Sequence, residues 1–411
     1  MPIFYRDLRI QYSVNPFGNS SFFETIYYYP RHYKKRGTIM NKNFIIFITI
    51  LALISISYLL LNGTESIQTV QEENKETADE TTSLHPVTKD GLVGFINQDG
   101  KMIIEATFNR VITKRAYKHD ELIPVKKTEK GKVGFIDKTG EFVIEPKFEA
   151  AFPFQEELAM VLMNGKVGYI GKKGHFIVEP TYSLKDFPFS EGIEMTFFNE
   201  GLAAVQVEGK GWGYIDKSGA VVIEPQFEFA SRFSEGVAFV KVDGLYGFID
   251  KSGSIVIDAE YEHALPFSEG VAAVKKENKY GYINNNGEFV IEPQFDIAKS
   301  FTNDIAPVFK KQTANGGETD LGISVGYINR EGELVIDFQY EGDEFSDFTF
   351  NDGLAIARSG LNYGFINTSG EVKIPFSYEQ VYPFSYGLSK VVVGDRESYI
   401  NTEGKVVYSS K

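Results

Sequence analysis

The chain has 411 residues, a formal net charge of −14 and no cysteine. The length is enough to bury a large core, and the lack of cysteine excludes disulfides, thiol catalysis and a lipidated N-terminal cysteine. The acidic balance argues against a nucleic-acid partner, which needs basic grooves, and is compatible with cationic partners or counter-ions.

The first 43 residues read as a short cytoplasmic segment or a misassigned N-terminal extension. They are crowded with Tyr and Phe and show no clean periodicity, whereas Met40 begins "MNKNFIIF", which is typical of the start of an exported protein. We therefore expect translation to start at Met40 and not at Met1. An intact mass of the native protein that included residues 1–39 would contradict this expectation.

Residues 44–61 read "FIIFITILALISISYLLL", which is 18 residues without a charge. A helix of that length spans about 27 Å, close to the hydrocarbon core of about 30 Å. Basic residues dominate before it and glutamates follow it, so the positive-inside rule places the N-terminus inside and the rest outside. We predict an uncleaved, single-pass membrane anchor. The alternative is secretion after signal cleavage, but the apolar run exceeds 7–15 residues and no clear small-x-small site follows.

Residues 62–86 are polar and acidic and contain almost no large apolar side chains. They cannot bury enough surface to fold, so we expect a flexible linker.

Residues 87–411 form a tandem array. A glycine before an aromatic residue recurs in eight copies, a ninth copy has Ser398 there, and a second glycine follows six residues later in all nine. The spacing between copies is 40, 34, 45, 34, 34, 45, 38 and 34 residues, which indicates a repeat. The first glycines are Gly94, Gly134, Gly168, Gly213, Gly247, Gly281, Gly326 and Gly364.

Each copy predicts a three-stranded antiparallel meander. Segments such as "GVAAVK", "YGYID" and "VVIEPQF" are short, rich in β-branched and aromatic residues, and bounded by turn residues. The turn "DKSG" at 216–219 suits a hairpin closed by a left-handed glycine. Both faces of the second and third strands read as apolar, so we expect neighbouring units to cover both faces.

The pair Trp212-Gly213 allows two interpretations: a ligand platform, or a packing residue beside a glycine that permits close backbone approach. Equivalent positions hold Val or Tyr, and Val cannot replace a stacking platform, so we favour packing. The pattern [WYV]-G-[FY]-I, the second glycine and "VIEPxF" resemble the WG (KWG) β-repeat of bacterial proteins. That resemblance covers about 87–408 and implies a repeat architecture without implying an activity.

The sequence contains no recognisable catalytic or metal-binding motif, and we predict no catalytic, cofactor-binding or metal-binding residues. No two of the five histidines have metal-ligand spacing. The glutamate of "VIEP" could form a cation-binding row, but a solvated strand end is favoured, and residues 310–324 are expected to be a floppy loop tip. The residues weighed are His32, His85, His119, His175, His263, Glu145, Glu179, Glu224 and Glu292.

The sequence therefore predicts an all-β array of about nine units, arranged as an open superhelical stack, with a closed propeller-like ring as the alternative. The predicted function is a membrane-anchored binding or scaffold module for a protein or cell-wall polymer, with no enzymatic activity. The alternative is a glycan-binding or glycan-processing enzyme on a propeller-like scaffold.

Overall fold

The computed structural model describes residues 83–112, 115–118, 121–184, 193–314, 319–342 and 348–410. The segments 1–43 and 44–61 and nearly all of 62–86 lie outside these ranges, and so does His119. Within the described ranges, no helix has the length and apolarity needed to cross a membrane.

One unit shows the plan of the others. The short strand β15 (Phe229–Ala230) is followed by β16 (Val237–Val242), β17 (Leu245–Asp250) and β18 (Ile255–Tyr261), and the four strands pair antiparallel in that order. The three longer strands are the predicted meander. The short strand comes directly after the last strand of the preceding unit, and it was not predicted from the sequence.

Nine such units follow one another, and units 1, 4 and 8 lack the short strand within the described ranges. Units 7 and 8 share one sheet through the pair Glu341 and Arg358. Unit 4 is preceded by the 3₁₀ turn η2 (Ile193–Thr196).

The strands of the other units have the following bounds. Unit 1 has β1 (His85–Lys89), β2 (Leu92–Ile96) and β3 (Met102–Phe108); unit 2 has β4 (Arg110–Val111), β5 (Ile123–Lys126), β6 (Val133–Ile136) and β7 (Phe142–Phe148); unit 3 has β8 (Ala150–Ala151), β9 (Leu158–Met163), β10 (Lys166–Gly171) and β11 (Phe176–Tyr182); and unit 4 has β12 (Leu202–Val207), β13 (Gly211–Asp216) and β14 (Val221–Phe227). Unit 6 has β19 (His263–Ala264), β20 (Ala272–Lys276), β21 (Lys279–Ile283) and β22 (Phe289–Phe295); unit 7 has β23 (Ile297–Ala298), β24 (Ala306–Ala314), β25 (Thr319–Ile328) and β26 (Leu334–Gly342); unit 8 has β27 (Leu354–Ser359), β28 (Asn362–Asn367) and β29 (Val372–Tyr378); and unit 9 has β30 (Gln380–Val381), β31 (Leu388–Val393), β32 (Arg396–Asn401) and β33 (Val406–Ser409).

The turn between the last two strands of a unit has the predicted form. In unit 4 the Gly219 N–H donates to the Asp216 carbonyl over 2.9 Å, and Gly219 has a φ of +86°. The Asp216 side chain accepts from the backbone N–H groups of Ser218 and Ala220. A glycine is required here because an L side chain rarely adopts this conformation.

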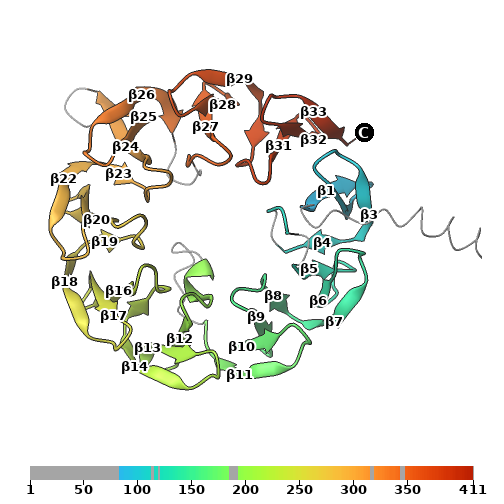
Figure 1. Cartoon of the computed structure of the whole chain (residues 1–411), viewed down its shortest axis with the longest axis horizontal. Coiled ribbons are helices and arrows are strands. Elements are labelled where there is room, and N and C mark those ends of the chain that lie inside the picture. Colours follow the sequence, from blue (N-terminus) through green and yellow to red (C-terminus); the bar gives the residue numbers. More distant parts are fainter. Residues whose placement is uncertain are drawn as a thin grey trace, which may run out of the picture. The chain divides into compact units, whose positions relative to one another are not determined.

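The strands of a unit are not covered equally. Residues 212–215 in the middle strand β13 are all buried, as predicted for a strand with two apolar faces. The last strand differs, because in β18 Ile255 is 50% exposed and Val256 is 46% exposed. Figure 1 shows that the last strand of each unit lies at the outside of the array, where its outward-facing side chains reach solvent although Ile223 and Ile257 of β14 and β18 remain buried against neighbouring units. The expectation that neighbours cover both faces of the third strand is therefore wrong.

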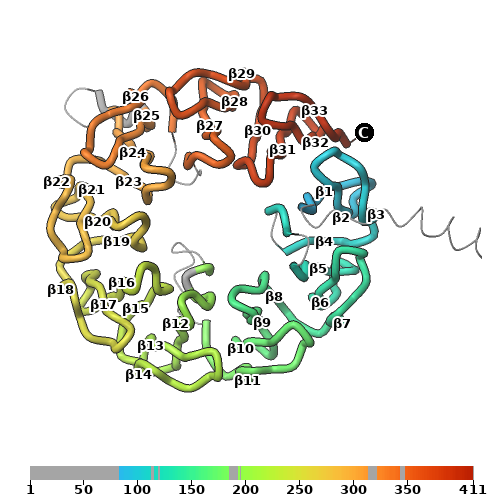
Figure 2. Tube along the Cα trace, viewed as in Figure 1, coloured from blue at the N-terminus to red at the C-terminus, as the bar shows by residue number. Residues whose placement is uncertain are grey.

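The units succeed one another around a circle (Figures 1 and 2). Units 1 and 9 are in contact through hydrogen bonds and a buried apolar cluster. The Tyr399 hydroxyl donates to the Pro86 carbonyl over 2.6 Å, and Gln98 Nε2 donates to the Tyr386 carbonyl over 3.0 Å. Val87 and Leu388 belong to one buried cluster across this boundary. The contact departs from the open stack that the sequence favoured, in which the terminal units lie far apart.

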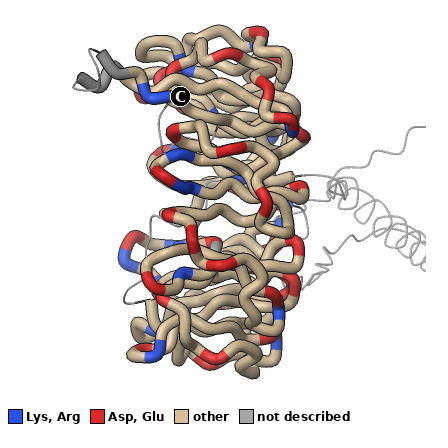
Figure 3. The backbone as a smooth tube through the Cα atoms, turned by 90° about the vertical axis from the view of Figure 1, so that its left-hand side faces the viewer, with Lys and Arg blue, Asp and Glu red and all other residues tan. Residues whose placement is uncertain are grey.

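Charged residues of both signs are spread over the array, many of them in the loops at its two edges (Figure 3). The interior is apolar and forms clusters that cross from one unit to the next, as between β14, β16 and β18. The core therefore lies in the junctions between units.

Candidate functional site

Trp212 is a packing residue, as predicted. It is 1% exposed, and its ring centroid lies 5.5 Å from that of Phe229 in the next unit. Val133 and Val325, at the equivalent position in other units, are also buried. A ring enclosed in this way has no face left for a ligand to stack on.

Gly213 is required by a backbone crossing. Trp212 pairs with Phe227 and Tyr214 pairs with Ile223, so three residues of β14 stand opposite Gly213 alone. A Cβ on Gly213 would lie 2.5 Å from the Ile223 carbonyl oxygen and 2.7 Å from the Pro225 nitrogen. This bulge confirms the prediction of close backbone approach.

The ninth unit shows why its serine is tolerated. Ser398 pairs directly with Ser409, and their hydroxyl oxygens are 2.9 Å apart. No crossing strand lies over Ser398, so the position has room for a side chain.

The glutamates of "VIEP" lie on the exposed last strands. All four are exposed, as the solvated interpretation predicts: Glu145, Glu179, Glu224 and Glu292. In the described ranges, no three His, Asp or Glu side chains are placed to hold a metal ion.

The three described histidines lie in different environments. His85 is buried, with its Nε2 2.9 Å from the Ser83 hydroxyl oxygen, and burial lowers its pKa from 6.5 to about 4. His175 is exposed, and His263 lies between the rings of Tyr246 and Tyr280. His32 and His119 lie outside the described residues.

The segment 310–324 is mostly a β-hairpin and not a floppy tip, which corrects that expectation. β24 and β25 stay paired from Ala306 with Ile328 out to Ala314 with Thr319. β26 continues alongside, so that Ile323 pairs with Gly342. Local strand pairing thus orders the insertion up to the residues beyond the described part.

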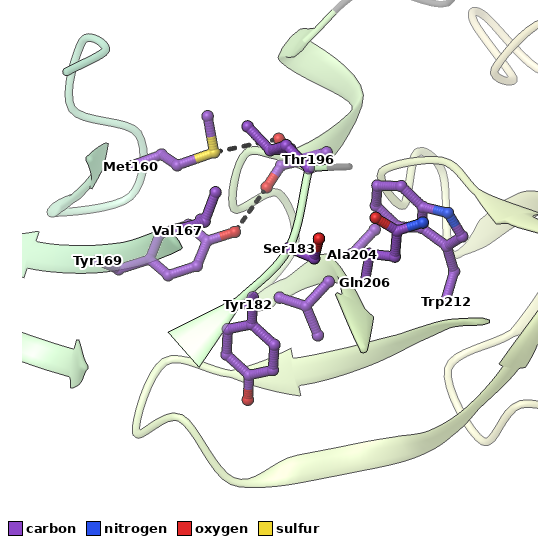
Figure 4. Close-up of a pocket in the computed structure, with 11 residues that line it drawn as sticks. Met160, Val167, Tyr169, Tyr182, Ser183, Thr196, Ala204, Gln206 and Trp212 are labelled. Atoms are coloured by element: carbon purple, nitrogen blue, oxygen red, sulfur yellow. Dashed lines mark hydrogen bonds between the residues drawn. The ribbon is translucent and has the colours of Figure 1, made fainter. Parts of the chain in front are cut away.

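A small cavity lies between units 3 and 4, where unit 4 lacks its short strand (Figure 4). Its volume is about 10 Å³, enough for about one water molecule. η2 bounds it, since Tyr169 donates its hydroxyl proton to the Thr196 carbonyl over 3.0 Å. The buried Gln206 Oε1 beside it has no hydrogen-bond partner among the described residues. The cavity suits a structural water and is too small for an organic ligand.

The junctions between units repeat one set of contacts. The aromatic residue after the first glycine packs on a ring of the next unit, with centroids 4.8 to 6.3 Å apart. At eight junctions the second ring comes from the loop before the next long strand, and at the ninth it is His85 in β1. The pairs are Phe95–Tyr117, Phe135–Phe154, Tyr169–Phe198, Tyr214–Phe233, Phe248–Phe267, Tyr282–Phe301, Tyr327–Phe350, Phe365–Phe384 and Tyr399–His85.

Where the residue after the glycine is tyrosine, its hydroxyl crosses the junction. Tyr214 donates to the Ser231 carbonyl over 2.7 Å, and Tyr282 donates to the Lys299 carbonyl over 2.8 Å. Burial raises the pKa of the Tyr214 hydroxyl well above its ordinary value, so it stays protonated and remains a donor.

Acidic residues in the turns also cross the junctions. Glu156 accepts from the Gly201 N–H over 2.9 Å and pairs with Lys217 over 3.0 Å. Burial acts to raise the pKa of Glu156, but Lys217 and the Gly201 N–H outweigh it, so the pKa is lowered. The same contacts recur one junction further on, between Glu200, Gly236 and Lys251. These carboxylates hold neighbouring units together.

The fold and its junctions define a tandem β-repeat protein. A family model described as "WG containing repeat" matches residues 94–130, 134–166, 194–210, 212–246, 246–280, 280–312, 326–360 and 363–396. The matches cover more than half of the chain, which therefore belongs to the WG-repeat family.

No curated protein matches the chain. Among solved structures, it is similar to the computationally designed Ika8 protein, with 11% identity, a TM-score of 0.42, and coverage of 80% of this chain and 96% of that one. It is also similar to BamB from Moraxella catarrhalis, with 12% identity, a TM-score of 0.36, and coverage of 80% and 93%. Apo AztD from Citrobacter koseri shows 11% identity, a TM-score of 0.34, and coverage of 80% and 94%.

Proposed function

We propose that the array is a non-catalytic binding or scaffold module for a protein or cell-wall ligand. The observation that carries this proposal is the contrast between junctions and hairpin tips. The junction contacts repeat, whereas the tips differ in length and sequence, from "VDGL" at 242–245 to the long hairpin of β24 and β25. Variable loops on a rigid scaffold are where binding residues concentrate.

Binding of the purified full-length chain to isolated cell-wall polymer tests this proposal. We expect saturable binding that weakens when residues 313–321 are replaced by Asn-Gly. A variant with Asn286→Ala, which changes an exposed turn at the opposite end of the strands, is the control. Release of soluble fragments from the polymer would favour the alternative, a glycan-processing enzyme, and binding to neither polymer nor protein would contradict a binding module.

We also propose that the nine units close into a propeller-like ring. This rests on the contact between units 1 and 9, because an open stack has no ninth junction. The chain has no cysteine, so Gln98→Cys with Tyr386→Cys gives one pair for a short bis-maleimide cross-linker. We expect it to cross-link as fast as Glu200→Cys with Lys251→Cys, which make the equivalent contact between units 4 and 5. Cross-linking at the second pair alone would indicate an open array.

We further propose that residues 44–61 anchor the protein in a membrane, with the array outside. The support is the uncharged run of 18 residues and the basic residues before it. A membrane-impermeant maleimide should label a Lys251→Cys variant on intact cells, and the protein should stay with the membrane fraction. Recovery from the medium would instead indicate secretion after cleavage.

A further inference from the structure

The junction between units 9 and 1 is built from different residues than the other eight. There the aromatic contact of Tyr399 is made by His85, an ionisable side chain in β1, with ring centroids 5.6 Å apart at 72°. Positions equivalent to His85 in other units hold Ala159, Ala203 and Ala238, by register with the second strand. Among the nine junction ring pairs given above, this is the one that contains a histidine, and it lies where the two ends of the array meet.

The contacts that enclose His85 are with uncharged groups. It is 2% exposed, and its described hydrogen-bond partner is the neutral Ser83 hydroxyl. From unit 9 it faces the ring of Tyr399, whose hydroxyl is engaged by Pro86.

Two pairs of charged groups on the surrounding elements are engaged with each other, and Asp90, in the turn after β1, acts on Tyr408 of β33. In unit 9, Lys390 and Glu397 pair with each other. In unit 2, Arg115 pairs with Glu121 and covers the ring of Tyr117, whose backbone pairs with Leu84. Tyr408 of β33 has its own pKa raised by burial. In the described part of the chain, His85 has no ion pair.

A proton added to His85 would therefore be buried without a counter-ion among the described residues. Burying an unpaired charge costs much more than burying the neutral imidazole, and exposure to water relieves that cost. The local way to expose His85 is to separate units 9 and 1. No strand is shared across this junction, so separation breaks no sheet.

We propose that protonation of His85 opens the ring between units 9 and 1, while the other eight junctions stay closed. The inference rests on the closed ring proposed above. Burial lowers the pKa of His85 from 6.5 to about 4, so the exposed imidazole binds a proton at a higher pH than the enclosed one. As the pH is lowered from 6.5 to 4, the ratio of closed to open rings should decrease, by about 300-fold in total.

Two pairs of spin labels on the full-length chain test this inference. Asp99→Cys with Glu403→Cys places labels on equivalent exposed turns of units 1 and 9, and Ser252→Cys with Asn286→Cys does so for units 5 and 6. Between pH 7.5 and 4.5 we expect the first distance to lengthen and broaden and the second to stay constant. His85→Phe, which keeps a ring there, should abolish the change, and His85→Gln serves if that variant does not fold.

Each outcome decides the question. A first distance that stays constant down to pH 4.5, or one that lengthens equally in His85→Phe, overturns the inference. Lengthening of both distances also overturns it, because the whole array is then unfolding. A long and broad first distance already at pH 7.5 overturns the closed ring itself.

Discussion

At the scale of single residues, the two recurring glycines are required for different reasons. The first, such as Gly213, has no room for a Cβ beneath the crossing strand. The second, such as Gly253, combines a φ of +86° with contact to Ile223 of the preceding unit, 2.9 Å from where its Cβ would be. The large residue before the first glycine only fills space, which is why Trp, Tyr and Val all serve there.

Two opposite substitutions, Gly213→Ser and Ser398→Gly, test whether the crossing strand is the reason for the glycine. Gly213→Ser should lower the free energy of unfolding by about 2–3 kcal/mol, because the Ile223 and Pro225 backbone must move. Ser398→Gly should cost only about 0.5–1 kcal/mol, since no backbone crosses there. Urea unfolding monitored by circular dichroism measures both. Equal losses would contradict the crossing as the reason for the glycine.

At the scale of strands, the last strand of a unit forms the edge of its sheet on the outside of the array, except in unit 7, where β26 pairs with β27. Exposed strand edges invite pairing with other chains, and proline, charge and bulges discourage it. β14 has all three, in Glu224, Pro225 and the bulge opposite Gly213. The recurring "EP" is thus explained as protection of an edge, with no need for a ligand.

The long hairpin of unit 7, formed by β24 and β25, extends beyond the contacts that repeat at the junctions between units. Replacing residues 313–321 with Asn-Gly should leave the thermal midpoint within a few degrees of the original, because Ile323 and the strand pairs from Ala306 to Gln312 remain. Differential scanning calorimetry measures this change. A large drop in the midpoint would mean that the hairpin supports the fold.

The sequence predicted the parts of this fold that local chemistry determines. Turn glycines and alternating apolar segments located the three long strands, the nine units and the buried role of Trp212. Short strands such as β15 were missed because two residues carry no periodicity, and the exposure of Ile255 was missed because it depends on the position of a strand within the array. The contact of Tyr399 with His85 was missed because the two residues are far apart in the chain.

At the scale of the whole molecule, His85 links stability to pH. Its pKa of about 4 in the folded chain lies below the ordinary 6.5, so folding favours the neutral form. Its stabilising contribution is complete above pH 6.5 and is lost as the pH falls toward 4, by about 3 kcal/mol in total. Unfolding free energies from pH 7.5 to 4 should therefore fall more steeply for the original chain than for His85→Phe. Parallel curves would contradict this linkage.

The contact between units 9 and 1 also differs from the others in the length of chain that it spans. Tyr214 and Ser231 are 17 residues apart, whereas Tyr399 and Pro86 are 313 apart. Bringing distant segments together costs more conformational entropy, by about 3 kcal/mol for this ratio of lengths. Internal junctions can therefore form early from neighbouring segments, and the last contact to form during folding should be the one between the two ends.

This order of events should appear in the folding kinetics of tyrosine variants. Tyr399→Phe removes a contact that forms after the rate-limiting step, so it should speed unfolding and leave refolding nearly unchanged. Tyr214→Phe removes the same kind of bond at an internal junction and should slow refolding more. Stopped-flow fluorescence compares the two. A slower refolding rate for Tyr399→Phe would mean that the ends meet early, and that the circle guides folding instead of completing it.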